Sequence, residues 1–366
     1  MDARVTIVGA GPAGLAVGRE LRRRGIDPVL LERDTVGATW AGAYDHLRLH
    51  TRRGAAALPG MRYPRGASTF PRRDEVHAYL RAYADRFGLD VREGVEVSAV
   101  GREGGGRVQA GADVAAVERD GAAWLLATSA GPWRTAVLVW AAGIWAAPVV
   151  PPLPGRGRYA GEILHVRDYR GPAPFRGRRL LVVGAGNSGK DVAVVAVGVA
   201  ASVTIAVRGG AVFVPYPNPL SQRAGALWRR LPPRWADAAL RRLRRSYPEL
   251  GLPWPDLPMT AAVPVVGLEL IEAVSGGRVA VRPEATAFTG NGVRFADGGE
   301  AAFDAVVLAT GFRPATDPVA AFLDAAATPR EPTLFVVGAR YPTLETFLQQ
   351  LRREAPAVAR AVAGLG

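Results

Sequence analysis

Two glycine-rich loops with the same spacing constrain the fold of this chain more than any other feature. The first loop occupies residues 9–14 (GAGPAG) and the second occupies residues 184–189 (GAGNSG). Each follows a short apolar run and opens a segment rich in helix-forming residues. A strand, a glycine turn and a helix N-terminus in this order let the backbone and the helix dipole face a pyrophosphate. The sequence therefore predicts two Rossmann-like α/β units, each a doubly wound parallel sheet that binds a dinucleotide.

The charged residue that ends the next apolar run distinguishes the two dinucleotides. Glu32 ends the run after the first loop, and its carboxylate can accept hydrogen bonds from the ribose hydroxyls of FAD. Arg208 ends the run after the second loop, and its guanidinium suits the 2′-phosphate of NADPH. In a chain so rich in arginine, Arg208 can also be an ordinary surface charge. We expect FAD at the first loop and NADPH at the second.

The lack of cysteine narrows the chemistry of this 366-residue chain. It excludes disulfide bonds, thiolate metal sites and the redox-active cysteine pair of the pyridine-nucleotide disulfide reductases, which also carry paired fingerprints. The four histidines do not have a metal-binding spacing, so we expect no protein-bound metal. The length allows two or three domains with substantial cores.

The net charge of +13 comes almost entirely from arginine, since Lys190 is the only lysine. The arginines are scattered and not interleaved with aromatic residues, so we expect no nucleic-acid partner. One cluster, residues 223–247, places apolar residues at every fourth position from Trp235 to Tyr247, with arginines on the other face. We expect a solvated amphipathic helix over the core there. A contact with a membrane surface or a partner is the alternative.

The order of the motifs predicts that one nucleotide domain is inserted in the other. We expect an FAD domain made of residues 1–150 and 301–366, with a small β-meander at about 91–135. The NADPH domain is expected at 158–300, with a helical segment at about 219–250.

Three further segments carry expectations about the connections and the chain ends. The proline-rich run 148–154 is expected to be a stiff linker, and the strand-like run 305–310 to return the chain to the first domain. Thr343 or Thr346 is expected to cap the last helix, 344–362. The first fingerprint begins close to Met1, and no apolar run is long enough to span a bilayer. A cytoplasmic protein without an integral membrane segment is therefore expected.

Several separated motifs resemble those of the class B flavin-dependent monooxygenases. Residues 159–169 (YAGEILHVRDY) place an aromatic residue, glycine, histidine and an aromatic residue as in the identifying pattern of that class. Residues 31–40 (LERDTVGATW), 44–50 (YDHLRLH) and 309–311 (ATG) are similar to other family motifs. Within the flavin-containing monooxygenase family, the chain most resembles the YUCCA-type enzymes and their bacterial relatives. The resemblance covers nearly the whole chain and is specific for the class, not for a substrate.

The resemblance implies a reaction cycle. NADPH reduces FAD, the reduced flavin forms a C4a-(hydro)peroxyflavin with O2, and NADP+ stays bound to protect it. One oxygen atom goes to a small organic substrate, by N- or S-oxygenation or by Baeyer–Villiger or decarboxylative oxidation of a carbonyl or keto acid. The cofactors carry this chemistry, which agrees with a sequence that shows no catalytic triad, carboxylate pair or metal set.

Two alternatives remain open from the sequence. The first is an NADPH-dependent flavoprotein reductase or oxidase that transfers no oxygen. The second is a nucleotide-binding module with a structural or sensing role, against which both intact glycine loops and both closing charges argue. The expected partners are a small-molecule substrate and O2, and both a monomer and a homodimer are compatible with the sequence.

The candidate site residues follow from the motifs. At FAD we expect Gly9, Gly11, Pro12, Ala13, Gly14, Glu32, Arg33, Thr39, Trp40, His50, Val97, Gly143 and Gly311. At NADPH we expect Gly184, Gly186, Asn187, Ser188, Gly189, Lys190, Arg208 and His165. For His165, the alternative to cofactor contact is packing at a hinge between the domains. For His50, the alternative is packing within its loop.

Arg72 is the candidate catalytic residue, because the chain departs from the family there. After Phe70 and Pro71, relatives often place a small polar residue thought to lie near the flavin. A guanidinium at this position could stabilise a deprotonated peroxyflavin and favour attack on a carbonyl. The alternative is that Arg72 points to solvent or to a cofactor phosphate. The expected substrate wall, residues 211–260, is rich in proline, tryptophan and arginine, which suits an aromatic or apolar ligand and allows an anionic one.

Overall fold

The first fingerprint lies at the carboxyl end of the central strand of a mostly parallel sheet. The computed structural model describes residues 2–103, 123–218, 232–340 and 347–365. In that part of the chain the sheet has seven strands, in the order β3-β2-β1-β6-β5-β4, with β19 also paired to β6. The strands are β1 (Ala3–Val8), β2 (Val29–Glu32), β3 (Asp90–Glu93), β4 (Val97–Arg102), β5 (Trp124–Thr128), β6 (Gly131–Trp140) and β19 (Leu334–Val336).

Alternation along β6 shows how this sheet is covered on both faces. Val137 and Val139 pack in one core cluster with the helices, whereas Leu138 and Trp140 pack with the antiparallel meander β4–β6. The helical layer contains α1, which has Pro12 at its first turn, a favoured position for proline because its φ is pre-set for a helix. The helices of this domain are α1 (Pro12–Arg22), α2 (Ala38–Ala41), α3 (Arg53–Ala56), α4 (Arg73–Arg86) and α9 (Phe347–Ala363).

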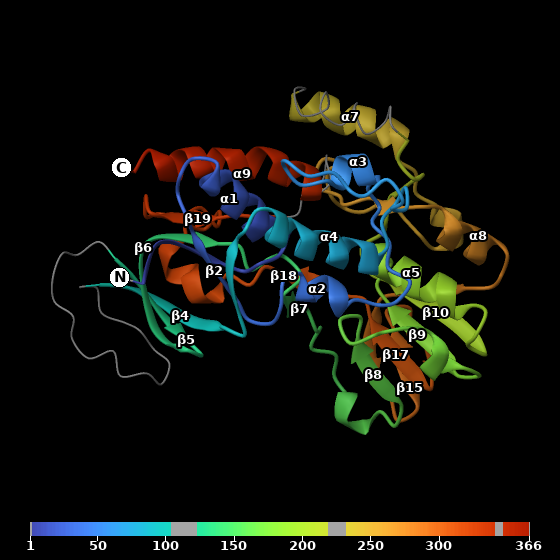
Figure 1. Cartoon of the computed structure of the whole chain (residues 1–366). Coiled ribbons are helices and arrows are strands. Elements are labelled where there is room, and N and C mark those ends of the chain that lie inside the picture. Colours follow the sequence, from blue (N-terminus) through green and yellow to red (C-terminus); the bar gives the residue numbers. More distant parts are fainter. Residues whose placement is uncertain (1, 104–122, 219–231, 341–346, 366) are drawn as a thin grey trace.

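The second fingerprint opens a separate parallel sheet with the order β13-β10-β9-β17-β8. One face packs against α5 and α8, and the other against a three-stranded antiparallel sheet, β14-β15-β16. The elements are β8 (Glu162–His165), β9 (Arg179–Val183), α5 (Asn187–Ala196), β10 (Ser202–Val207), α8 (Glu269–Ser275), β13 (Ala280–Pro283), β14 (Ala285–Phe288), β15 (Gly292–Phe295), β16 (Glu300–Ala302) and β17 (Ala305–Leu308). The fold is therefore two Rossmann-like nucleotide-binding domains, visible as two lobes in Figure 1.

The expected return of the chain to the first domain at residue 301 is wrong. The run at 305–308 forms β17, which pairs in parallel with both β9 and β8 in the second sheet. An uninterrupted apolar run is typical of any buried parallel strand, so its sequence does not say to which sheet it belongs. The chain crosses back later, at β18 (Phe312–Arg313), which pairs antiparallel with β7 (Ala147–Pro148). The proline-rich outgoing connection thus begins beside the returning one.

The face of the arginine-rich helix that packs inward also differs from the expectation. In α7 (Pro233–Leu243), Trp235 is 62% exposed and Leu243 is 59% exposed, whereas Ala236 and Leu240 are buried. Leu240 packs with Met259 and its neighbours, so a row next to the expected one faces the protein. The earlier part of the 219–250 segment and both expected caps of the last helix, Thr343 and Thr346, lie outside the described residues.

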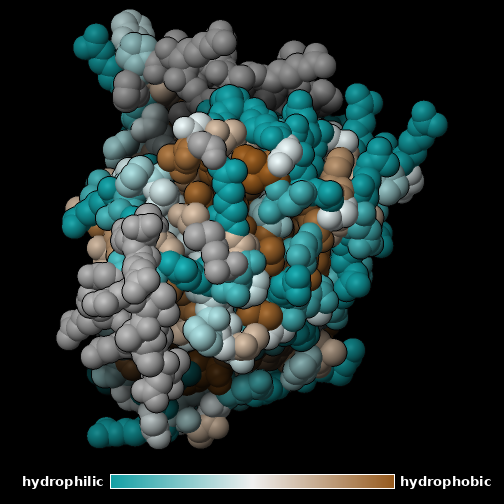
Figure 2. Space-filling model, turned by 60° about the vertical axis from the view of Figure 1, so that its left-hand side comes forward, coloured by the Kyte–Doolittle hydropathy of each residue, from teal (hydrophilic) through white to brown (hydrophobic). Residues whose placement is uncertain are grey.

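The remaining short elements complete the fold. A two-stranded parallel pair joins β11 (Phe213–Val214) and β12 (Val265–Val266), and short 3-10 helices lie at Arg156–Arg158, Ala173–Phe175, Pro248–Leu250 and Asp317–Phe322. The face in Figure 2 is largely hydrophilic, with hydrophobic residues in the recesses. None of the helices in the described part of the chain combines the length and the apolar character that a bilayer crossing requires.

Candidate functional site

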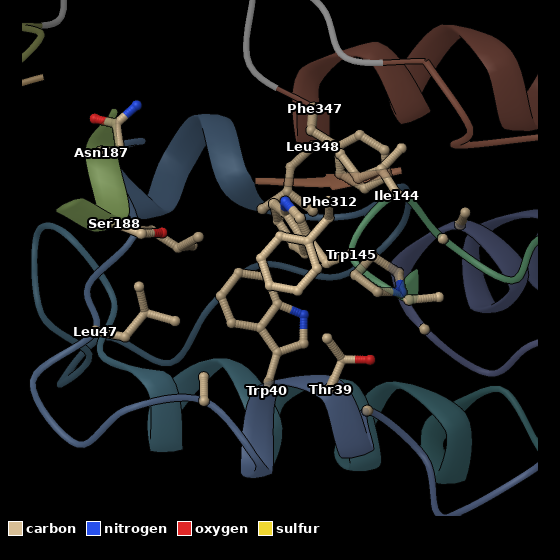
Figure 3. A pocket seen from close by; sticks show the side chains of 18 of the residues that line it. Thr39, Trp40, Leu47, Ile144, Trp145, Asn187, Ser188, Phe312, Phe347 and Leu348 are labelled. Carbon is tan, nitrogen blue, oxygen red and sulfur yellow. The ribbon is translucent and has the colours of Figure 1, made fainter. Parts of the chain in front are cut away.

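A cavity of about 1130 Å³ extends from the first fingerprint to the first turn of α5. Its walls include the loop that follows β2, the end of β6, the end of α7 and the start of α9. Figure 3 shows aromatic and aliphatic side chains gathered on one side, opposite Asn187 and Ser188 of α5. The aromatic contacts include Trp40 against Trp145, with ring centroids 5.5 Å apart. The cavity therefore combines a nucleotide-binding loop with a largely apolar chamber.

The two glycine loops have the same local geometry. Gly9 has φ +104° and Gly184 has φ +109°, in the region that favours glycine. A Cβ on Gly9 would lie 2.5 Å from the carbonyl oxygen of Ala141, and one on Gly184 would lie 2.5 Å from that of Ala309. In each loop, the third glycine lets the helix pack against the turn, because a Cβ there would overlap the carbonyl oxygen of the first glycine.

The middle glycine of each loop differs from the other two. A Cβ on Gly11 or on Gly186 would have no protein atom within 4 Å. Both residues are N-caps, of α1 and α5, so the space in front of them is open at a helix N-terminus. That is the cradle a dinucleotide pyrophosphate requires. The residues present in both domains thus fit a bound dinucleotide.

The charges expected to distinguish the two dinucleotides lie at equivalent strand ends. The Glu32 carboxylate accepts hydrogen bonds from the backbone N–H of Ala10 (2.7 Å) and of Asp34 (3.0 Å), which hold it at the cavity wall. Arg208 directly follows β10, the neighbour of β9, and is exposed outside the cavity. The roles expected for Glu32 in ribose recognition and for Arg208 in 2′-phosphate recognition stay predictions.

Most residues expected at FAD line the cavity. These are Gly9, Gly11, Pro12, Ala13, Glu32, Arg33, Thr39, Trp40, His50, Val97 and Gly143. Gly14 and Gly311 do not line it. Sequence reasoning missed the apolar wall formed by Leu47, Ile144, Trp145, Phe312, Phe347 and Leu348, because isolated apolar residues on separate segments leave no local pattern.

Of the residues expected at NADPH, only Asn187 and Ser188 line this cavity. The Asn187 side chain donates to the carbonyl oxygen of Pro264 (3.0 Å) and accepts from the N–H of Val266 (2.9 Å). It therefore fixes β12 beside the second fingerprint. Gly184, Gly186, Gly189, Lys190, Arg208 and His165 lie outside the cavity.

Comparison with known proteins decides the family. Residues 2–326 match the family model described as FMO-like, flavin-binding monooxygenase-like. The chain is 34% identical over 322 residues to indole-3-pyruvate monooxygenase YUCCA8 of Oryza sativa subsp. indica, covering 84% of this chain and 75% of that protein. This chain belongs to the flavin-binding monooxygenase-like family. It is a flavin-dependent monooxygenase, and its cofactors are FAD and NADPH.

Solved structures show the same fold. The flavin-containing monooxygenase of Stenotrophomonas maltophilia superimposes with a TM-score of 0.74 at 24% identity, covering 100% of this chain and 99% of that one. An oxidized steroid monooxygenase bound to NADP gives a TM-score of 0.72 at 19% identity, covering 99% and 85%. The resemblance read from the motifs is confirmed.

Lys190 of this monooxygenase is not placed to contact NADPH through the cavity. Its amine is buried, donates to the carbonyl oxygen of Val266 (2.8 Å) and lies 3.0 Å from the Asp191 carboxylate. Burial by itself would lower the pKa of this lysine, but the charge of Asp191 and the hydrogen bond to it act in the opposite direction, and the pKa is raised. Lys190 therefore connects α5 to β12, and its expected contact with NADPH stays a prediction.

Asp191 also joins the two domains, which the sequence did not indicate. Its carboxylate accepts a hydrogen bond of 2.8 Å from the hydroxyl of Tyr44, on the loop after α2. His50 lines the cavity and places Nε2 3.9 Å from the same carboxylate. Burial raises the pKa of Tyr44 well above its ordinary value, and Asp191 adds to this effect. His50 thus contacts both the cavity and the second domain.

His165 is packed where the connections between the domains meet. Its Nε2 lies 3.2 Å from the carbonyl oxygen of Gly311, and its Nδ1 accepts from the backbone N–H of Arg167 (3.1 Å). These two bonds require the neutral tautomer with the proton on Nε2. The geometry supports the hinge interpretation, with the imidazole edge-on to Phe312.

We expect the stability of the protein to fall as the pH drops below about 6.5, and His165 to contribute to this loss. Burial lowers the pKa of His165, His50 and His46 from the ordinary value of 6.5. The unfolded chain then binds more protons than the folded one below pH 6.5, so stability is present above that pH and is lost below it. Chemical denaturation across this pH range should show a smaller loss of unfolding free energy for His165→Gln than for the wild type, because glutamine keeps a neutral donor. An unchanged pH dependence would contradict the prediction.

Arg72 is not at the cavity. It is exposed at the N-terminus of α4, where its backbone N–H donates to the Glu75 carboxylate (2.7 Å). Its proposed stabilisation of a peroxyflavin has no support in this geometry and is not retained. The reason is that residues 73–86 form a helix, and Arg72 is exposed at its N-cap, outside the residues that line the cavity.

Arg72→Ser should stabilise the protein by about 0.5–1 kcal/mol, since a serine hydroxyl could accept from the Glu75 N–H and complete a capping box. Arg72→Ala removes the same charge without adding a cap and is the matched control. Chemical denaturation measures both variants, and turnover should not change in either. A serine variant no more stable than the alanine variant would refute the capping argument.

In the ranges that the structure describes, histidine, aspartate and glutamate side chains do not form a group able to hold a metal ion.

Proposed function

We propose that this monooxygenase oxidises a small α-keto acid with an aromatic or apolar side chain, in a decarboxylative reaction. The observation that carries the proposal is the 34% identity to an indole-3-pyruvate monooxygenase over 84% of the chain. The apolar and aromatic cavity wall is compatible with such a side chain. In the balanced reaction, one α-keto acid, NADPH, O2 and one proton give the shortened carboxylic acid, CO2, NADP+ and water.

The residues of this chain would bind and orient the cofactors and keep water out. The N-terminus of α1 would face the pyrophosphate of FAD, and Glu32 would hold the ribose. When bound, reduced FAD would supply the oxygen-transfer chemistry. Trp40, Trp145 and Phe347 would form an apolar wall beside the reacting groups.

Oxygen labelling tests the proposal. The holoenzyme is supplied with NADPH, isotopically labelled O2 and a panel of α-keto acids including indole-3-pyruvate and phenylpyruvate, with heat-inactivated enzyme as the control. We expect one labelled oxygen atom in the acid product and one CO2 released per NADPH oxidised. Stoichiometric hydrogen peroxide without a labelled product across the panel would overturn the proposal that α-keto acids are the substrates.

A further inference from the structure

The arginine-rich helix α7 has an exposed face that neither nucleotide-binding loop uses. The helix lies at the upper edge of the molecule in Figure 1. Trp235 and Leu243 are each more than half exposed on it, whereas Leu240 packs inward against residues 259 and 262. Large apolar side chains are usually buried, and apolar surface that gathers on the outside of a protein marks a contact surface. The exposed face of α7 is therefore a candidate contact surface.

Two parallel rows of side chains make up this exposed face. Residues at every fourth position lie in one row along a helix, so Trp235 and Leu243 share a row. On one side of it lies the buried row that contains Leu240, and on the other side lies a row that contains Arg234 and Arg242. Both of these arginines are exposed. Apolar and cationic side chains thus run side by side along the outer surface of the helix.

The one acidic residue in the sequence of α7, Asp237, lies on the side of the helix that faces the protein. Asp237 is partly buried, and its carboxylate accepts a hydrogen bond from the backbone N–H of Thr260 (3.2 Å). The exposed face therefore combines arginines with apolar side chains, in a chain whose net charge is +13. Helices that carry tryptophan or leucine beside basic residues are typical of those that lie in the interface of an anionic bilayer.

The apolar row ends at the edge of the cavity. Leu243 and Val263 both line the cavity, and both are exposed to solvent. Side chains that do both lie where a cavity opens, so an opening lies beside the C-terminal end of α7. A surface bound to this helix would therefore lie next to the opening.

We propose that the exposed face of α7 binds the surface of a membrane that contains anionic lipids. Arg234 and Arg242 contact the lipid phosphates, and Trp235 and Leu243 enter the boundary between the headgroups and the acyl chains. The two parallel rows match the layered headgroups and acyl chains of a bilayer, whereas an acidic protein would need carboxylates matched to individual arginines. Such a contact is peripheral and needs no spanning helix. It does not depend on the substrate, and it places the cavity opening at a surface where apolar molecules concentrate.

Vesicle binding of the holoenzyme tests this inference without turnover. Cosedimentation at low salt compares vesicles of phosphatidylcholine alone with vesicles of equal parts phosphatidylcholine and phosphatidylglycerol. We expect the anionic vesicles to bind roughly thirtyfold more tightly, because each arginine near an anionic surface contributes about fivefold. The double variant Arg234→Gln/Arg242→Gln should lose this preference, and Trp235→Gln should weaken binding about tenfold through lost apolar burial. The matched control, Arg156→Gln/Arg158→Gln, removes the same charge from another exposed surface and should bind like the wild type.

Tryptophan fluorescence locates the contact. Anionic vesicles should shift the emission of the wild type to shorter wavelength, and Trp235→Phe should show a much smaller shift. Should Trp235→Gln fail to retain FAD, this fluorescence comparison decides, because phenylalanine keeps an apolar aromatic ring at the same position.

Three outcomes would overturn the inference. The first is a wild type that does not bind anionic vesicles at low salt. The second is an equal loss in the two double-arginine variants, because binding would then reflect net charge alone. The third is a dimer in solution that Trp235→Gln dissociates, without vesicle binding by the wild type, which would assign this face to a second copy of the chain.

Discussion

Replacing Gly11 by alanine should remove FAD from this monooxygenase while leaving the folded chain intact. A Cβ at Gly11 would meet no protein atom within 4 Å, so the fold has room for it. The same Cβ would occupy the space at the N-terminus of α1 in which the pyrophosphate must approach the backbone. A steric conflict of this kind costs about 1–3 kcal/mol, which corresponds to roughly tenfold to hundredfold weaker binding. The flavin-to-protein absorbance ratio after dialysis measures the loss, and circular dichroism reports the fold.

Three further alanine variants make this prediction specific. Gly186→Ala, at the equivalent position of the second loop, should retain FAD and weaken NADPH instead. Gly14→Ala places its Cβ 1.9 Å from the carbonyl oxygen of Gly9, so this variant should lose its folded structure as well as FAD. Gly157→Ala, which also meets no protein atom within 4 Å and lies outside both loops, should behave as wild type. Normal FAD content in Gly11→Ala would show that the cofactor does not lie against this loop.

Replacing Arg208 by glutamine should raise the KM for NADPH by about tenfold to hundredfold and leave the KM for NADH unchanged. The reason is that a charge-assisted hydrogen bond to a phosphate is worth about 1.5–3 kcal/mol, and NADH has no 2′-phosphate. Arg208 is exposed at the end of β10, so its replacement should not disturb the core. The rate of anaerobic flavin reduction, measured against the concentration of each coenzyme, gives both values.

The control is Arg176→Gln, which removes another exposed arginine of the same domain outside the fingerprint. It should affect neither coenzyme, which would exclude a general effect of net charge. Equal losses with NADPH and NADH in Arg208→Gln would mean that this arginine supports the loop and does not read the 2′-phosphate.

Short-range patterns determined the parts of this molecule that were predicted correctly. The glycine spacing alone implied the turns, because Gly9 and Gly184 adopt positive φ values and the third glycine of each loop permits close helix packing. Both fingerprint helices were expected from sequence, as were the ends of β2 and β10 that carry Glu32 and Arg208. Each of these features depends on residues close together in the chain.

Tertiary contacts decided the features that the sequence did not show. β17 is a strand by its own residues, but its place between β9 and β8 depends on pairing with segments far away in the chain. Arg72 has the residue type for a catalytic role, yet its position at the N-terminus of α4 removes it from the cavity. Arg244 shows the reverse, because it belongs to the arginine-rich cluster at 223–247 and yet is only 5% exposed beside the cavity. Which charges are buried follows from how distant segments pack, and that packing leaves no periodic signal in the local sequence.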